Sequence, residues 1–140
     1  RGTMNMDRKR RTQWAAQFAV ASELCKRGYE VAFTMGHTTP DADLMVMSES
    51  RRTFLVDAKG LYKKNPFVIK QKATRADLYY ILAFVPDEGK NEFFVMSQEE
   101  VQRLSKAELK RLGRSEDYSM PGLSWPCVQP FKNKWDTLPK

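Results

Sequence analysis

The stretch PDADLMVMSESRRTFLVDAKG, residues 40–60, decides the fold of this chain. It contains two apolar runs of strand length, residues 44–47 and 53–56, and a short polar segment joins them. Apolar runs separated in this way predict a β-hairpin. The acidic and basic residues that flank the two runs are therefore candidates for one shared site.

Two acidic residues and one lysine stand at the ends of these predicted strands. Asp43 opens the first strand and Asp57 closes the second, so antiparallel pairing is expected to bring their carboxylates to the same end. Side chains alternate along a strand, so Asp57 and Lys59 are expected to face the same way, while Ala58 faces the other side. The hairpin thus predicts a hard-cation site with a charged lysine beside it.

Such a site suits the hydrolysis of phosphodiesters. Mg²⁺ prefers oxygen ligands, binds through one or two carboxylates and keeps several waters. A bound metal makes water a better nucleophile and stabilises charge on the phosphate. Lys59 is expected to orient that water or to neutralise a phosphate oxygen. The simpler alternative is a surface hairpin whose charges pair only with one another, because an Asp-x-Lys motif alone often occurs by chance.

Residues 12–60 resemble the core of the PD-(D/E)XK nuclease superfamily, which includes restriction endonucleases and archaeal Holliday-junction resolvases. The matching pieces are a helix ending in residues 23–29, a strand at 30–33, Asp43-Leu44 and Asp57-Ala58-Lys59. Asp41, beside Pro40, is the literal Pro-Asp pair, but Asp43 fits the strand start better. The resemblance implies a helix followed by a mixed sheet. It also implies Mg²⁺, with Mn²⁺ as a substitute, bound by Asp43, Asp57 and the backbone carbonyl of Ala58.

The first helix supplies one more candidate for this site. An apolar face is expected from Trp14, Phe18, Ala21, Leu24 and Cys25, with Cys25 a reduced core residue and Gly28-Tyr29 the end of the helix. Gln17 projects within that face. In many members of the superfamily a glutamate from this helix reaches the metal, so the resemblance implies that Gln17 is a neutral member of the site. A buried glutamine satisfied by backbone groups is the alternative.

The net charge and its distribution indicate a polyanionic partner, expected to be DNA. The formal net charge is +7, which alone bears only on solubility and nonspecific binding. No acidic residue lies between Asp57 and Asp77, and bases cluster there, directly after the predicted metal site. In some members of the superfamily a glutamine or lysine after this strand contacts the metal-bound water or the scissile phosphate, so the resemblance implies that either Gln71 or Lys72 could return to the site. Nucleic-acid contacts are therefore expected from Lys63, Lys64, Lys70, Gln71, Lys72 and Arg75, although any one of them could be a solvated side chain.

The remaining sequence predicts further strands and short helices. Apolar runs favour strands near residues 67–69, 78–85 and 92–96. Ser97 and Ser105 each begin a capping signal, which predicts one helix to about residue 104 and a second ending near Gly113. Residues 114–140 are expected to form an irregular tail, in which Trp125, Phe131 and Trp135 pack against the sheet rather than stack on bases.

Other kinds of site are disfavoured by the composition. Two cysteines without paired spacing and the single residue His37 give no zinc or multi-histidine pattern. His37 is expected to be a solvated loop residue, with a role in acid–base chemistry as the alternative. The sequence has no apolar stretch long enough to span a membrane and no signal peptide, so a cytoplasmic protein without a membrane partner is expected.

Together these features predict one PD-(D/E)XK-like α/β domain over residues 4–140, with residues 1–3 a remnant of expression. A mixed sheet of four or five strands is expected, with a long N-terminal helix on one face and shorter helices on the other. The leading function is a Mg²⁺-dependent DNA endonuclease, which acts alone, as a homodimer or in a larger nuclease complex. The alternative is a catalytically inactive protein of the same fold that binds nucleic acid or a protein partner.

Overall fold

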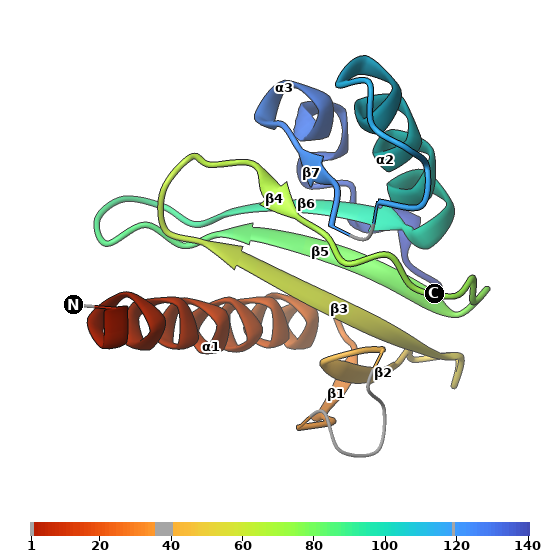
Figure 1. Cartoon of the computed structure of the whole chain (residues 1–140). Helices are drawn as coiled ribbons and strands as arrows, with labels where there is room; N and C mark the ends of the chain where they lie inside the picture. Colours follow the sequence, from red (N-terminus) through yellow and green to blue (C-terminus); the bar gives the residue numbers. More distant parts are fainter. Residues whose placement is uncertain (1, 36–40, 119) are drawn as a thin grey trace.

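A mixed five-stranded sheet lies between two layers of helices in the computed structural model (Figure 1). The structure describes residues 2–35, 41–118 and 120–140. The strands run in the order β1-β2-β3-β5-β6, in which β3 and β5 are parallel and every other neighbouring pair is antiparallel. This confirms the predicted mixed sheet. Its strands are β1 (Glu30–Phe33), β2 (Leu44–Met47), β3 (Thr53–Leu61), β5 (Leu78–Phe84) and β6 (Glu92–Ser97).

The predicted hairpin is formed by β2 and β3. Leu44 pairs with Val56, and the backbone N–H of Asp43 donates to the carbonyl of Val56 over 3.0 Å. Asp43 therefore lies next to Asp57 at one end of β2. The prediction that Asp57 closes its strand is wrong, because β3 continues to Leu61 by parallel pairing with β5. The site thus lies at a fork: β2 begins at Leu44, and its partner β3 continues beyond that point to Leu61.

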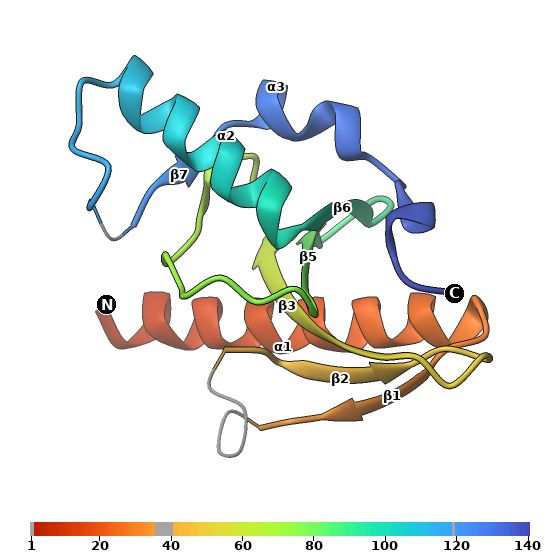
Figure 2. The ribbon, with the colours of Figure 1, turned by 90° about the vertical axis from the view of Figure 1, so that its right-hand side faces the viewer.

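Helix α1 (Gly2–Lys26) lies across one face of the sheet, and its N-terminal turns extend past the strands (Figure 2). Its buried stripe is Thr12, Ala16, Val20 and Leu24, which recur every fourth residue. The helix ends as predicted, with Gly28 in the left-handed region at φ +93°. The small residues of this stripe let the helix approach β3 closely. A Cβ atom on Gly60 would lie 2.6 Å from the Cβ of Ala16.

The apolar face predicted for α1 is partly wrong. Phe18 is 58% exposed and Cys25 is exposed rather than in the core, although Leu24 and Ala21 are buried as expected. Phe18 instead stacks on Trp14 with ring centroids 5.7 Å apart and meets the edge of Phe33 at 5.4 Å. These aromatic side chains therefore form a cluster at the surface instead of packing in the core.

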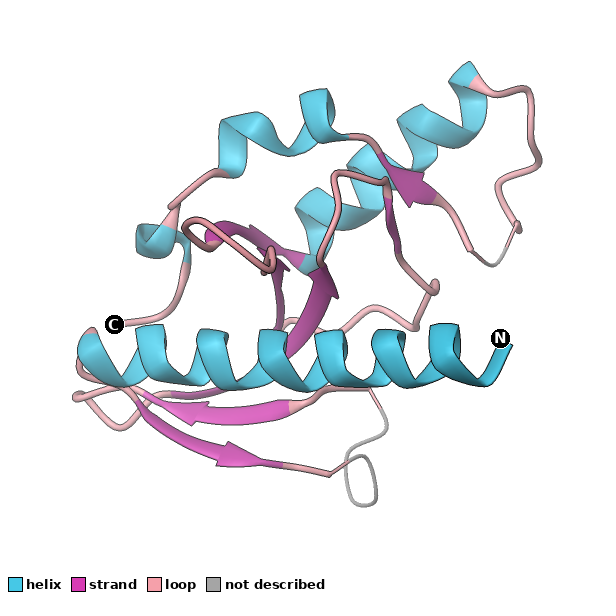
Figure 3. Cartoon of the chain, turned by 90° about the vertical axis from the view of Figure 1, so that its left-hand side faces the viewer, coloured by secondary structure: helices cyan, strands magenta, loops and turns pink. Residues whose placement is uncertain are grey.

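The opposite face of the sheet is covered by the later part of the chain (Figure 3). Helix α2 (Gln98–Arg111) begins at Ser97, whose capping box with Glu100 is present as predicted. The predicted break at Ser105 is wrong. Ser105 lies buried inside a single helix, on the same face as Val101 and Leu109.

The C-terminal segment contains short elements rather than an irregular tail alone. Trp125 stacks on Phe67 at 5.7 Å, and Phe131 and Trp135 are each 8% exposed, so the predicted packing roles are confirmed. The C-terminus returns to the end of α1, where the hydroxyl of Tyr29 donates to the carbonyl of Pro139 over 2.9 Å. The short elements of this segment are β7 (Gly122–Leu123), α3 (Trp125–Val128) and 3₁₀ turns at Gln129–Phe131 and Trp135–Thr137. Strand β7 pairs with β4 (Phe67–Val68) from the middle of the chain.

Candidate active site

Asp43 and Asp57 lie side by side at the fork between β2 and β3. Asp43 lies immediately before β2, and its Oδ2 accepts a hydrogen bond from the backbone N–H of Ala58 over 2.9 Å. Asp57 lies within β3 and is only 2% exposed. The predicted convergence of the two acidic residues is therefore confirmed.

The environment of Asp43 is unfavourable for a second negative charge. Burial, and next the charge of Asp57, raise the pKa of Asp43 to about 6, while the hydrogen bond from Ala58 opposes this shift. Near neutral pH Asp43 is thus ionised at a cost in free energy, since its burial and the nearby charge of Asp57 both oppose its own charge. A cation bound between them would relieve that repulsion, as expected of a metal site.

Two lysines surround the carboxylate of Asp57. The Nζ of Lys59 lies 3.9 Å from Oδ1, so Lys59 is on the predicted side of β3. The Nζ of Lys72 is closer, at 2.5 Å from Oδ2, and also donates to the backbone carbonyl of Asp41 over 2.6 Å. Lys72 was predicted to contact nucleic acid or to return to the site; it returns to the site, where it is the closer ion-pair partner of Asp57.

Gln13, rather than Gln17, connects α1 to the site. Its Nε2 donates to the carbonyl of Ala58 over 2.6 Å, and its Oε1 accepts from the N–H of Gly60 over 3.3 Å. Gln17 is half-buried, and within the described part of the chain it has no hydrogen bond to β3. The sequence held a signal for this difference, because Thr12, Ala16, Val20 and Leu24 recur every fourth residue. When this stripe faces the sheet, it turns the neighbouring Gln13 toward β3.

A cleft of about 820 Å³ opens beside Asp43. Three lysines and one aspartate are the charged residues of its lining, which gives the cleft a positive balance. Lys9 on α1 and Thr12 line one side, and the segment that follows β3 lines the other. Asp57 is not exposed there, so Asp43 is the acidic residue that faces the cleft. Its polar lining includes Lys9, Gln13, Asp43, Lys59, Tyr62 and Lys63.

The predicted basic run is divided among different roles. Lys63 lines the cleft, and Lys70 is exposed. Lys64 lies over the ring of Trp125 at 5.4 Å. Gln71 donates to backbone carbonyls at Glu116 and Tyr118, so it helps to fix its own segment.

Arg75 does not have the free guanidinium that a phosphate contact needs. Its guanidinium donates two hydrogen bonds to the carboxylate of Asp77, at 3.0 and 3.1 Å. The Nη1 of Arg75 also lies 3.8 Å from the Oδ2 of Asp41. The carboxylate of Asp41, the literal Pro-Asp residue, is therefore paired with Arg75, while its backbone carbonyl accepts from Lys72. His37 and Pro40 lie outside the described residues.

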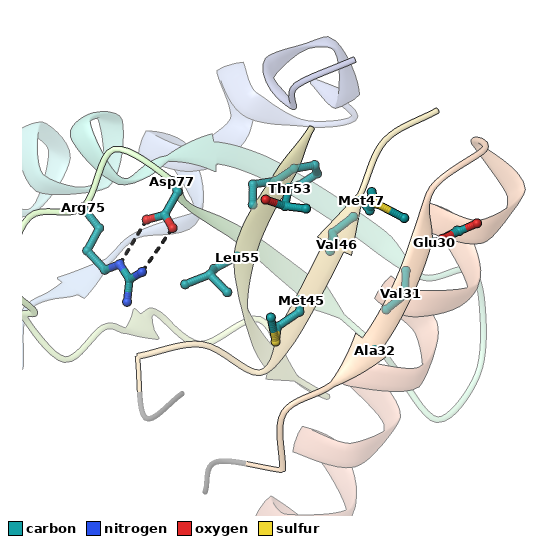
Figure 4. Close-up of a pocket in the computed structure, with 11 residues that line it drawn as sticks. Glu30, Val31, Ala32, Met45, Val46, Met47, Thr53, Leu55, Arg75 and Asp77 are labelled. Atoms are coloured by element: carbon teal, nitrogen blue, oxygen red, sulfur yellow. Dashed lines mark hydrogen bonds and ion pairs between the residues drawn. The ribbon is translucent and has the colours of Figure 1, made fainter. Parts of the chain in front are cut away.

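A second hollow, of about 610 Å³, lies on the face of β1, β2 and β3 (Figure 4). Strand alternation puts Met45 and Leu55 on its floor, on the same face as Asp43 and Asp57. Arg75 and Asp77 stand at its rim and pair with each other. This hollow offers an apolar surface, whereas the groups suited to chemistry lie in the cleft beside Asp43.

The side chains at the fork fit a water-rich Mg²⁺ site. Among the described residues there is no group of three or more His, Cys, Asp or Glu side chains that could bind a metal. Mg²⁺ needs only one or two carboxylates, because it keeps several waters. The carbonyl of Ala58 accepts a hydrogen bond from Gln13 and has a second lone pair free for a metal or a water.

Neither a protein-family model, a curated protein sequence nor a solved structure matches this chain. The described helices include none that is both long enough and apolar enough to cross a membrane.

Proposed function

We propose that the protein is a Mg²⁺-dependent nuclease of the restriction-endonuclease-like class that hydrolyses DNA phosphodiester bonds. The observation that carries this proposal is the pair formed by Asp43 and Asp57 at the fork, with the ammonium group of Lys59 3.9 Å from Asp57. Ion pairing alone does not account for this pair: Asp43 has no salt bridge among the described residues, and burial, followed by the charge of Asp57, raises its pKa to about 6.

Each residue at the fork has a role in this proposal. Asp43, Asp57 and the carbonyl of Ala58 would bind Mg²⁺, which supplies an activated water and charge stabilisation when bound. Lys59 is 32% exposed, so its ammonium can turn from Asp57 toward a phosphate oxygen or the attacking water. Gln13 takes the place proposed for Gln17. It fixes the backbone of β3 on both sides of Lys59.

The cleft supplies a path for the polyanion. Lys9 and Lys63 line it together with Lys59, and these cations would follow the phosphate backbone. The nuclease would act alone, as a homodimer or within a larger nuclease complex.

A non-catalytic binding protein of the same fold is the second candidate. It is favoured by Gln13, a neutral residue on the helix from which many members of the superfamily supply a glutamate. It is also favoured by Lys72, which already neutralises Asp57. In that case the cleft would bind nucleic acid without cutting it.

A cleavage assay separates the two functions. Plasmid, linear and branched DNA would each be incubated with the protein in Mg²⁺, Mn²⁺ or EDTA. The nuclease proposal predicts metal-dependent cleavage that Asp57→Asn abolishes. If the wild-type protein binds DNA but cuts none of these substrates in either metal, the binding function is supported instead.

A further inference from the structure

The segment that carries Lys72 is fixed at both ends. Residues 69–77, between β4 and β5, contain no helix or strand. Gln98 of α2 donates to the carbonyl of Ala73 over 3.0 Å and accepts from the N–H of Arg75 over 2.6 Å. At the other end, the N–H of Ile69 donates to the carbonyl of Pro121 over 2.9 Å. The backbone at Lys72 is thus held in place, and its side chain reaches inward from a fixed point.

The ammonium group of Lys72 is held by three neighbouring groups. Besides its contacts with Asp57 at 2.5 Å and the carbonyl of Asp41 at 2.6 Å, it lies 5.8 Å from the ring centre of Tyr80. The side chain of Lys72 is 14% exposed, and that of Asp57 is 3% exposed. An ammonium held by two oxygens and an aromatic ring at this depth is a specific contact rather than a solvated lysine.

The buried carboxylate of Asp57 requires a counter-charge, and Lys72 supplies it. A buried carboxylate without a counter-charge destabilises a protein strongly. Lys59 is more distant and more exposed than Lys72, so Lys72 is the principal counter-charge of Asp57. A divalent cation at the same carboxylate would meet the repulsion of this nearby ammonium.

We infer that Lys72 is a tethered counter-ion that competes with the divalent cation for Asp57 and so sets the metal affinity of the site. The inference rests on the proposed function, because it needs a metal at Asp43 and Asp57. In the metal-free protein the ammonium neutralises Asp57, and metal binding must displace it. The competition makes metal binding weaker than two adjacent carboxylates would otherwise give.

Metal titration without DNA tests this inference. MnCl₂ would be titrated calorimetrically into the wild-type chain, Lys72→Met and Lys72→Gln. Lys72→Met removes the charge and keeps most of the stem, and Lys72→Gln retains a hydrogen-bond donor for Asp57, which protects the fold. Both variants should bind Mn²⁺ about tenfold more tightly than the wild type. Lys70→Met removes an exposed charge two residues away and should bind Mn²⁺ as the wild type does.

A thermal-shift measurement provides the second readout. Without metal, both Lys72 variants should melt at a lower temperature than the wild type, because Asp57 loses its partner. Saturating Mn²⁺ should raise their melting temperature more than that of the wild type, in line with tighter binding. If the wild type binds Mn²⁺ and both variants bind it equally or more weakly, the counter-ion inference is wrong and the proposed metal site stands. If neither the wild type nor any variant binds Mn²⁺, the proposed function fails as well.

Discussion

At the scale of single residues, the account depends on how charge is arranged around Asp57. Strand alternation and hairpin pairing sufficed to predict that Asp43, Asp57 and Lys59 converge, because these rules are local. The resemblance allowed either Gln71 or Lys72 to return to the site, but the sequence could not show that Lys72 pairs with Asp57, since that contact depends on where a segment without regular structure is anchored. Gln13 was missed because the largest apolar side chains of α1 suggested the wrong face.

Removing the ammonium group of Lys59 should slow the chemistry far more than it weakens DNA binding. Negative charge builds up on the phosphate only as the water attacks, so a preorganised cation acts mainly on the transition state. We expect Lys59→Ala to lower the single-turnover cleavage rate by roughly two to three orders of magnitude. DNA affinity measured in Ca²⁺ should change much less.

The matched control for Lys59 is Lys63→Ala, which removes a lysine from the same cleft but away from Asp57. This variant should weaken binding and leave the rate at saturating DNA close to that of the wild type. Equal cleavage rates for Lys59→Ala and the wild type would refute the proposed role of Lys59.

The raised pKa of Asp43 makes the stability of the metal-free protein depend on pH. The pKa is about 6 in the folded protein against a reference value of 3.8. Between these values the folded state binds more protons than the unfolded state, so stability falls as pH rises through this window. Asp43→Asn keeps an oxygen for the N–H of Ala58 and removes the charge. At pH 7 the free energy of unfolding of Asp43→Asn should exceed that of the wild type by about 1 kcal/mol, after allowance for solvent screening.

Urea unfolding of both proteins at pH 4.5 and pH 7 measures this difference. The advantage of Asp43→Asn should shrink at the lower pH, where Asp43 is protonated in the wild type. Saturating Mn²⁺ at pH 7 should stabilise the wild type more than the variant. An advantage of the same size at both pH values would show that the pKa of Asp43 is not raised in the folded protein.

At the scale of elements, the site depends on how closely α1 approaches β3. The extents of β1, β2, β5 and β6 were predictable to within a residue or two, because each is a distinct apolar run. The extension of β3 past Asp57 to Leu61 was not, since it comes from parallel pairing with β5, a long-range contact. The continuity of α2 through Ser105 likewise depends on burial, which a local capping signal does not report.

Gly60→Ala should separate α1 from β3 and disturb the site. The added methyl group would lie 2.6 Å from the Cβ of Ala16 and 2.9 Å from the carbonyl oxygen of Thr12, so the helix must move. Overpacking of this kind costs roughly 1–3 kcal/mol. The free energy of unfolding in urea should fall by this amount, and cleavage should fall with it because Gln13 shifts away from Ala58.

Gly122→Ala is the matched control, because its new Cβ would make only an ordinary contact, 3.5 Å from the Cβ of Pro66. It should unfold close to the wild type. If Gly60→Ala is as stable as Gly122→Ala, the close packing of α1 on β3 is not as described.

At the scale of the whole molecule, positive charge is gathered at the cleft from distant parts of the sequence. The net charge of +7 predicted a polyanionic partner, but the residues that line the cleft come from both α1 and the segment after β3. The predicted run between Asp57 and Asp77 included Lys63 and omitted Lys9. Tertiary structure brings Lys9 and Lys63 together, so a count of charges along the sequence could not show that both line the cleft.

The cleft lysines should determine how DNA affinity depends on salt. Each phosphate contact releases counterions, so losing two contacts reduces the slope of log affinity against log salt by about two. We expect this change for the double variant Lys9→Ala, Lys63→Ala. The double variant Lys106→Ala, Lys110→Ala removes the same charge from exposed positions on α2 and should keep the wild-type slope. Equal slopes for the two variants would show that DNA does not follow the cleft.

The central claim is that a divalent cation binds between Asp43 and Asp57, and the most direct measurement is an anomalous difference map from crystals grown with Mn²⁺. The account predicts a peak in contact with both carboxylates, with the ammonium of Lys72 moved away from Asp57. Absence of a peak at the fork, with Lys72 still paired to Asp57 at saturating Mn²⁺, would contradict it.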